Sequence, residues 1–301
     1  MARRHIVLLG TKLDAEQQAL LEELATLLNE VAASGKDKDD KKYAEKFVYV
    51  QHHFDESVTH VITTATESQQ FILQGRTMKY FQGLLAGCWV LGVDWIAASL
   101  CARKMMPEQD YLVRGDSKLL QPDGEPIPSG AKRARNQTQL FKGLHFVWAS
   151  SVASKPTTRD DVTKLIHLGG GEVAAALPDM HTSRTRSKES HESDIEEGES
   201  QLDDFPTSKE SSPIRPTPRG YAHFTSVASH GHGGRWFLLV DDTSVKRSKP
   251  GNELKTLKRF VTPADWHHCV KHHIEIVGVN WLFDSISAFK IQPTEKPQAT
   301  K

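Results

Sequence analysis

The chain has 301 residues, and its 38 Lys and Arg balance 38 Asp and Glu, so the formal net charge is zero. This length predicts about two domains, and the neutral charge excludes a polycation that binds nucleic acid through its overall charge, although a local basic patch is allowed. Three widely spaced cysteines, Cys88, Cys101 and Cys269, argue against a disulfide framework and favour a reducing compartment. The apolar run at residues 6–9 is too short for a signal peptide or a membrane span, so we expect no membrane partner.

The first part of the chain reads as alternating strands and helices. Its strands are continuous apolar runs, which is typical of a parallel sheet covered on both faces. Asp14 and Gln17 have the spacing of a capping box at the start of a helix, and residues 34–46 form a charged loop. In chain order we expect a strand at 6–9, a helix at 14–29, a strand at 58–63, a helix at 77–86 ended by Gly87, a strand at 88–91 and a helix around Trp95.

The second part of the chain has the same kinds of element but is interrupted. We expect a strand at 144–150, a helix at 160–168 ended by the glycines 169–171, a strand at 236–240 and a helix around Trp281. Residues 181 to about 233 are rich in Ser, Glu, Lys and Pro and poor in aliphatic side chains, which predicts a disordered insertion. Prolines and glycines between residues 117 and 139 indicate an interdomain linker.

An internal repeat supports this division. Residues 90–100 (VLGVDWIAASL) align with residues 276–286 (IVGVNWLFDSI), and the alignment pairs Trp95 with Trp281. We therefore predict an α/β protein with a first domain at 1–116, a linker at 117–139 and a second domain at 140–295. Trp95 and Trp281 are expected to lie in the two cores.

Enzyme and metal signatures are weak. The three glycines at 169–171 follow a helix rather than a strand, which is the wrong order for a dinucleotide site. Residues 267–273 hold four histidines and Cys269, but zinc ligands normally come from two places in the sequence, and no second place is evident. We expect no catalytic site, no metal and no cofactor.

A turn between the first strand and the first helix has the residues of an anion site. Thr11 offers a hydroxyl, Lys12 offers a backbone N–H, and Lys79 could add a charge. The alternative from spacing alone is that Thr11 caps the helix and Lys79 is a solvated lysine.

Longer segments resemble the tandem BRCT family. Residues 76–100, 103–116 and 132–135 resemble the tandem BRCT region of the breast-cancer-susceptibility protein, and residues 8–28, 87–91 and 163–173 resemble its RING-domain partner. The resemblance implies two BRCT-like repeats, each a four-stranded parallel sheet flanked by three helices, packed head to tail. It also implies an activity of binding rather than catalysis.

The resemblance further implies a phosphoserine site on the first repeat and a pocket between the repeats for the third residue after the phosphoserine. The implied phosphate-binding residues are Thr11, Lys12, Thr77 and Lys79. The implied pocket residues are Arg76, Phe81, Leu165 and Phe283. Lys12 stands where the family has glycine, Phe283 replaces a smaller apolar residue and Leu165 replaces a methionine.

The implied function is that of a nuclear scaffold that binds phosphorylated DNA-repair proteins in the DNA-damage response and in double-strand break repair. One alternative is a reader of ubiquitylated nucleosomes in a RING ubiquitin-ligase complex. Another is direct binding of DNA ends or poly(ADP-ribose). The basic cluster has two interpretations. One is a functional signal, either for nuclear import or for anchoring to acidic or phosphate surfaces, and the other is a solvated linker; its residues are Lys132, Arg133 and Arg135.

Overall fold

The computed structural model describes residues 5–34, 47–120, 126–134, 136, 139–150, 156–178, 234–245 and 252–297. The charged loop expected at 34–46 lies outside the described residues except for Ser34, as do the insertion expected at 181–233 and Arg135. Both repeats fall within one compact unit of the chain. None of the described helices combines the length and the apolar character that crossing a membrane requires.

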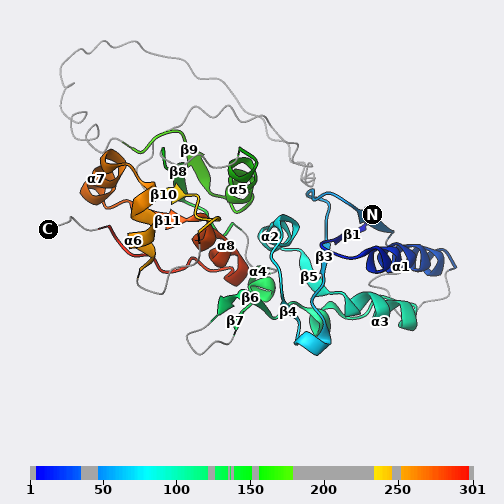
Figure 1. Ribbon diagram of the computed structural model, residues 1–301. Helices are drawn as coiled ribbons and strands as arrows, with labels where there is room; N and C mark the ends of the chain where they lie inside the picture. The colour runs from blue at the N-terminus through cyan, green and yellow to red at the C-terminus, as the bar shows by residue number, and fades with distance from the viewer. Residues whose placement is uncertain are drawn as a thin grey trace, which may run out of the picture. The chain divides into compact units, whose positions relative to one another are not determined.

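The first repeat is built on a parallel sheet with the strand order β2-β1-β3-β5. All four residues of β3 are buried, which explains why the strands appear in the sequence as continuous apolar runs. Helices α1 and α3 cover one face of this sheet and α2 covers the other (Figure 1). The elements are β1 (Ile6–Gly10), α1 (Ala15–Ser34), β2 (Val48–Gln51), β3 (His60–Thr63), α2 (Met78–Leu85), β5 (Trp89–Gly92) and α3 (Asp94–Ala102).

Local side-chain chemistry sets the ends of these helices. The predicted capping box at α1 is confirmed: the Gln17 N–H donates to Asp14 Oδ1 at 2.8 Å, and the Asp14 N–H donates to Gln17 Oε1 at 3.2 Å. At α2, Thr77 Oγ1 accepts a hydrogen bond from the Tyr80 N–H at 3.1 Å. Gly87 follows α2 with a φ of 71°, a conformation that favours glycine, and it ends the helix as expected.

The second repeat has the same topology. Its parallel sheet has the order β11-β10-β8-β9, which matches β5-β3-β1-β2 of the first repeat. No residue range for β9, α6, α7 or β11 was predicted from the sequence. The elements are β8 (Leu144–Trp148), α5 (Pro156–Leu168), β9 (Glu172–Ala174), β10 (Arg235–Val240), α6 (Glu253–Leu257), α7 (Pro263–His272), β11 (Glu275–Gly278) and α8 (Val279–Ala288).

The repeated tryptophans make the same hydrogen bond in both repeats. Trp95 Nε1 donates to the carbonyl oxygen of Met106 at 3.0 Å, and Trp281 Nε1 donates to that of Gln292 at 3.2 Å. Trp95 is fully buried, as predicted. Trp281 is only partly buried and packs against the edge of the core, so the prediction of an equivalent core position is wrong for this side chain.

The linker is partly folded. Strand β4 (Ile72–Leu73) of the first repeat pairs with β6 (Gly115–Leu120), which also pairs with β7 (Pro126–Pro128). A short helix, α4 (Ala131–Ala134), follows. Just before it, the Gly130 N–H donates to the carbonyl oxygen of Ser287 at 2.7 Å. The linker is therefore hydrogen-bonded to the second repeat as well as to the first.

The two repeats meet through helices, because α2 packs against α5 and α8 (Figure 1). The rings of Phe81 on α2 and Phe283 on α8 stack with centroids 4.6 Å apart and planes 13° apart. One continuous apolar core includes buried residues of both repeats, which accounts for the stability of this contact.

Candidate anion-binding corner and adjoining pocket

Two threonine hydroxyls meet where β1 ends and α2 begins. Thr11 follows β1, and its N–H extends the strand pairing by donating to the carbonyl oxygen of Ile62 at 2.9 Å. Thr77 caps α2. The two Oγ1 atoms lie 2.8 Å apart, within hydrogen-bonding distance, and Thr11 is only 5% exposed. The structure thus brings together two of the residues that the resemblance assigned to phosphate binding.

Two lysines flank this pair of hydroxyls. Lys79, in the first turn of α2, donates from Nζ to the carbonyl oxygen of Gly10 at 3.3 Å. Lys12 is exposed and has a φ of 58°. The left-handed backbone that a glycine would favour is therefore adopted by a lysine, at a cost of about 1 kcal/mol. We call Thr11, Lys12, Thr77 and Lys79 the anion corner.

A pocket of about 380 Å³ adjoins the corner. Its lining comes from both repeats and from linker strand β6, and the residues are Lys12, Gln74, Gly75, Arg76, Lys118, Asn280 and Phe283. Gly75 makes room for Lys12, since a Cβ at Gly75 would lie 2.7 Å from Lys12 Nζ. Lys12 therefore belongs to both the anion corner and the pocket.

An ion-pair network holds the wall of the pocket. Arg76 pairs through Nε with Asp116 and through Nη2 with Asp284, the latter at 2.8 Å. Burial alone would lower the pKa of Arg76, but Asp116 and Asp284 outweigh it and raise that pKa. Asp116, which is 1% exposed, also accepts a hydrogen bond from Ser287 Oγ at 2.9 Å. Linker, first repeat and second repeat thus meet at one buried carboxylate.

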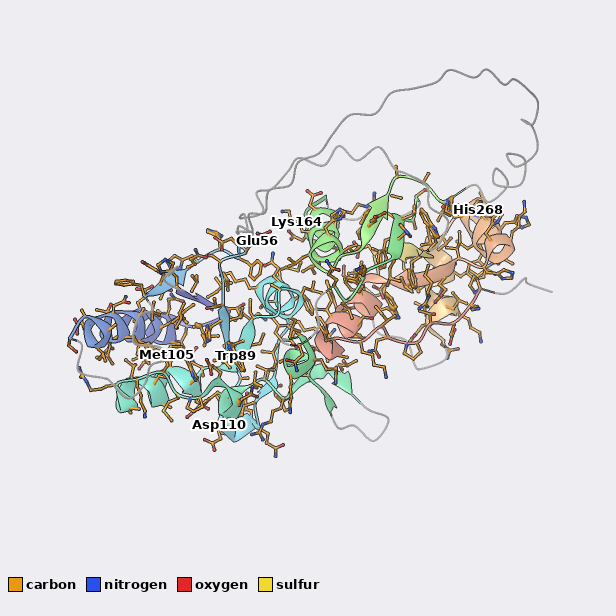
Figure 2. All side chains as sticks on the ribbon, turned by 180° about the vertical axis from the view of Figure 1, so that it is seen from behind. Glu56, Trp89, Met105, Asp110, Lys164 and His268 are labelled. Carbon is orange, nitrogen blue, oxygen red and sulfur yellow. The ribbon has the colours of Figure 1, made fainter. Side chains whose placement is uncertain are left out.

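The expected pocket residues divide into two groups. Arg76 and Phe283 line the pocket, whereas Phe81 lies behind Phe283 and is 2% exposed. Leu165 on α5 is fully buried in the apolar core and does not line the pocket, so its assignment was wrong. Its neighbour Lys164, labelled on α5 in Figure 2, is 71% exposed, so the two adjacent side chains face different surroundings, one the core and the other the solvent.

Several residues of the site were missed by the sequence reasoning. They are Gln74, Gly75, Asp116, Lys118, Asn280 and Asp284. Lys118 lies in the segment expected to be a plain linker, Asp116 is the last residue of the expected first domain, and no local pattern marks Asp284 as the partner of Arg76. In the basic cluster, Arg133 donates from Nε to the carbonyl oxygen of Ala288 at 3.1 Å, so this arginine contacts the end of α8, while Lys132 is exposed.

The histidine-rich segment forms the end of α7. His268, labelled in Figure 2, and His272 have ring centroids 4.4 Å apart. Cys269 between them is fully buried, and burial, with a smaller effect from Asp265, raises the pKa of its thiol to about 12. Within the described part of the chain, no cluster of three or more His, Cys, Asp or Glu side chains is placed to hold a metal ion.

The two like-ordered parallel sheets, the helical contact between them and the repeated tryptophan helix form the architecture that the resemblance to tandem BRCT repeats predicts. The chain is similar to human BRCA1-associated RING domain protein 1, with 30% identity over 187 residues, or 60% of this chain and 19% of that protein. It is also similar to the rat breast cancer type 1 susceptibility protein homolog, with 29% identity over 140 residues, or 46% of this chain and 7% of that protein. These relatives confirm the resemblance found in the sequence.

The chain spans no more than about a fifth of the length of these relatives. Among solved structures, it is similar to the BRCT5-BRCT6 domains of S. pombe Brc1, with 18% identity, a TM-score of 0.34, and coverage of 57% of this chain and 66% of that one. No protein-family model matches the chain.

Proposed function

We propose that this chain is a phosphopeptide-binding module, in which the anion corner binds a phosphoserine and the adjoining pocket binds a residue that follows it. The observation that carries the proposal is the pair of Thr11 and Thr77 hydroxyls, 2.8 Å apart at the start of α2, with Lys79 beside them. Binding rather than catalysis is the activity that these groups support.

The chemistry of the corner suits a phosphate dianion. Hydroxyl groups and the backbone N–H groups at the start of a helix donate to phosphate oxygens, and the helix dipole favours negative charge there. The Lys79 ammonium has three donors, so it can keep its long bond to Gly10 and still donate to a phosphate. Hydrogen bonds between charged groups are about twice as strong as neutral ones, so Lys79 should contribute most.

Partners and location follow from the relatives and belong to the proposal. The human relative is, by its name, a RING-domain protein associated with BRCA1. We propose that the ligands of this chain are phosphorylated DNA-repair proteins and that it acts in the nucleus, in the response to double-strand breaks. We further propose a RING ubiquitin-ligase partner, which the name of the human relative supports, and a ubiquitylated nucleosome as an alternative partner.

The test is a fluorescence-polarisation titration with pairs of peptides that differ only in the phosphate on one serine, selected from a phosphoserine peptide library. We expect the phosphorylated member to bind and Lys79→Met to weaken it by at least about tenfold, because a charge-assisted hydrogen bond is lost. The unphosphorylated member should have the same affinity for the parent chain and for the Lys79→Met variant.

The matched control is Lys104→Met, which removes an exposed lysine of the same repeat outside the corner and the pocket. This variant should bind like the parent chain. Equal affinity for phosphorylated and unphosphorylated peptides, or equal losses in the Lys79 and Lys104 variants, would contradict the proposal.

A further inference from the structure

Helix α2, which joins the two repeats, has a counterpart in α7 of the second repeat. Both helices begin after a capping threonine, and counting from these caps pairs Phe81 with Trp266 and Leu85 with Val270. Phe81 and Leu85 are each 2% exposed, because α2 packs against α5 and α8. Trp266 and Val270 are only partly buried, and in the described part of the chain no helix packs against α7 as closely. The described residues therefore leave this face of α7 incompletely covered.

The surface that receives α2 also has a counterpart, in the first repeat. Helices α5 and α8 follow β8 and β11 as α1 and α3 follow β1 and β5, and α1 and α3 lie side by side on one face of their sheet (Figure 1). The alignment of the repeats pairs Phe283, whose ring stacks on Phe81, with Ala97. It also pairs Ser287, which is 1% exposed, with Cys101, and both Ala97 and Cys101 are exposed. The chain thus carries both halves of a second contact of this kind, one on each repeat.

The side chains of these two halves are complementary in size. Within the chain, the contact pairs two rings of equal size, Phe81 and Phe283. Between two copies, the larger ring of Trp266 would meet the methyl group of Ala97, so that the bulk lost on one half is partly restored on the other. An aromatic ring against small side chains is typical of the centre of a protein interface.

The formal charges of the two halves are opposite. Residues 14–34 and 94–104, which hold α1 and α3, contain six acidic and two basic side chains. Residues 253–273, which hold α6 and α7, contain four basic and two acidic side chains and four histidines. Lys258 of this segment lies next to Trp266, with its Nζ 4.7 Å from the ring centroid. Opposite charges on two surfaces favour their encounter and fix their orientation.

From these observations we infer that α7 is a docking surface for a second copy of this chain, whose α1–α3 face takes the position that α5 and α8 take at α2. The contact joins unlike surfaces, so a pair of copies still has one unoccupied surface of each kind, and association can continue head to tail beyond a dimer. This inference does not depend on the proposed function, because neither surface contains a residue of the anion corner or of the pocket.

The experiment is sedimentation velocity of the full chain at concentrations from about 1 to about 200 μM. We expect the mean mass to rise with concentration above that of the monomer, because a contact between a few helices is small and typical of micromolar affinity. Higher salt should weaken the association, because exposed charges are screened.

Two variants block one surface each. Ala97→Arg places a large cation on the α1–α3 face, and the double variant Lys258→Glu with Arg259→Glu reverses the charge beside Trp266. Each should weaken self-association at least about tenfold, because each introduces a clash or a repulsion. Glu56→Lys is the control, since Glu56 is exposed and lies outside both surfaces, as its label in Figure 2 shows. It should associate like the parent chain.

An equimolar mixture of the two blocked variants is the decisive sample. One variant retains α7 and the other retains the α1–α3 face, so the mixture should form a dimer with the affinity of the parent contact and nothing larger. If the double variant does not fold, an excess of Ala97→Arg should reduce the mean mass of the parent assemblies, because it occupies one end and cannot extend it. A parent chain that stays monomeric, a blocked variant that associates as the parent does, or a mixture that stays monomeric would overturn the inference.

Discussion

The two repeats share a fold but differ at the anion corner. Strand pairing places Ala149 of the second repeat where Thr11 lies in the first, since each donates its N–H to the neighbouring central strand at 2.9 Å, Thr11 to Ile62 and Ala149 to Leu239. The hydroxyl is therefore absent at this position of the second repeat, where the side chain is the buried methyl group of Ala149.

The helix caps, in contrast, are the same in both repeats. Thr77 accepts from the N–H three residues later at 3.1 Å, and Thr262 does so at 3.0 Å at the start of α7. Two residues after the cap, however, the first repeat has Lys79 and the second has Ala264. The comparison separates what the fold requires, a capped helix, from what the first repeat adds, a second hydroxyl and a cation.

The largest expected difference between the repeats concerns the tryptophans. Trp95→Ala should lower the free energy of unfolding by about 3–5 kcal/mol, because it empties a fully buried site. Trp281→Ala should cost clearly less, because this ring is partly exposed. Urea unfolding of both variants measures the difference, and equal losses would show that the two sites are equally buried in solution.

A smaller difference in stability concerns Tyr80, the third residue after the cap Thr77 of α2. The third residue after the cap Thr262 of α7 is Asp265. Burial, with the nearby charge of Asp116, raises the pKa of Tyr80 to about 12. An unfolded tyrosine titrates near pH 10, so the unfolded chain loses its proton first, and stability falls as the pH rises from about 10 to 12.

Tyr80→Phe removes this titration. The parent chain should lose up to about 2 kcal/mol more stability than the variant over this pH range. Urea unfolding at pH 8, 10 and 11 tests the expectation, with the stability at pH 8 as the reference for each protein. Parallel pH profiles would show that the phenol is not kept neutral by the fold.

The smallest expected effects come from the shared caps. Thr77→Ala and Thr262→Ala should each cost about 1 kcal/mol of stability, since each removes one cap hydrogen bond. Of the two variants, Thr77→Ala should also weaken phosphopeptide binding, because the Thr77 hydroxyl lies 2.8 Å from the hydroxyl of Thr11. Thermal unfolding and peptide titration of both variants check this, and weaker peptide binding by Thr262→Ala would contradict the assignment of the corner to the first repeat.

The parts of the fold that depend on local pattern were predictable. The aligned tryptophan segments identified the repeat, and the Asp14–Gln17 spacing located the start of α1. The meeting of Thr11 and Thr77 came from the resemblance rather than from spacing, because 66 residues separate them and only the parallel pairing of the sheet brings them together.

The rest depended on tertiary contacts. In the sequence, Leu165 is one of several apolar residues at helical spacing, and nothing distinguishes it from the others. The packing of α5 against α2 decides that it is buried in the core instead of facing a pocket. Strand β6 runs from the end of the expected first domain into the expected linker, and it forms because its first residues, Gly115 and Asp116, pair with β4, which is far away in the sequence. The linker strand β7 in turn pairs with β6. Asp116 and Asp284 acquire their role from Arg76, which neither of them adjoins in the chain.

In each repeat, the tryptophan indole N–H donates to a carbonyl oxygen that follows the last helix, so the residues after this helix contribute to the stability of the repeat. The N–H of Gln292 donates to Ser285 Oγ, and its carbonyl oxygen accepts from Trp281, just as Met106 does with Ser99 and Trp95. A premature stop codon at Gln292 would therefore leave the sequence of every described helix and strand of the second repeat intact. It would still destabilise the repeat, because both hydrogen bonds of Gln292 would be lost. Truncated variants of the protein should therefore retain this short extension as part of the domain.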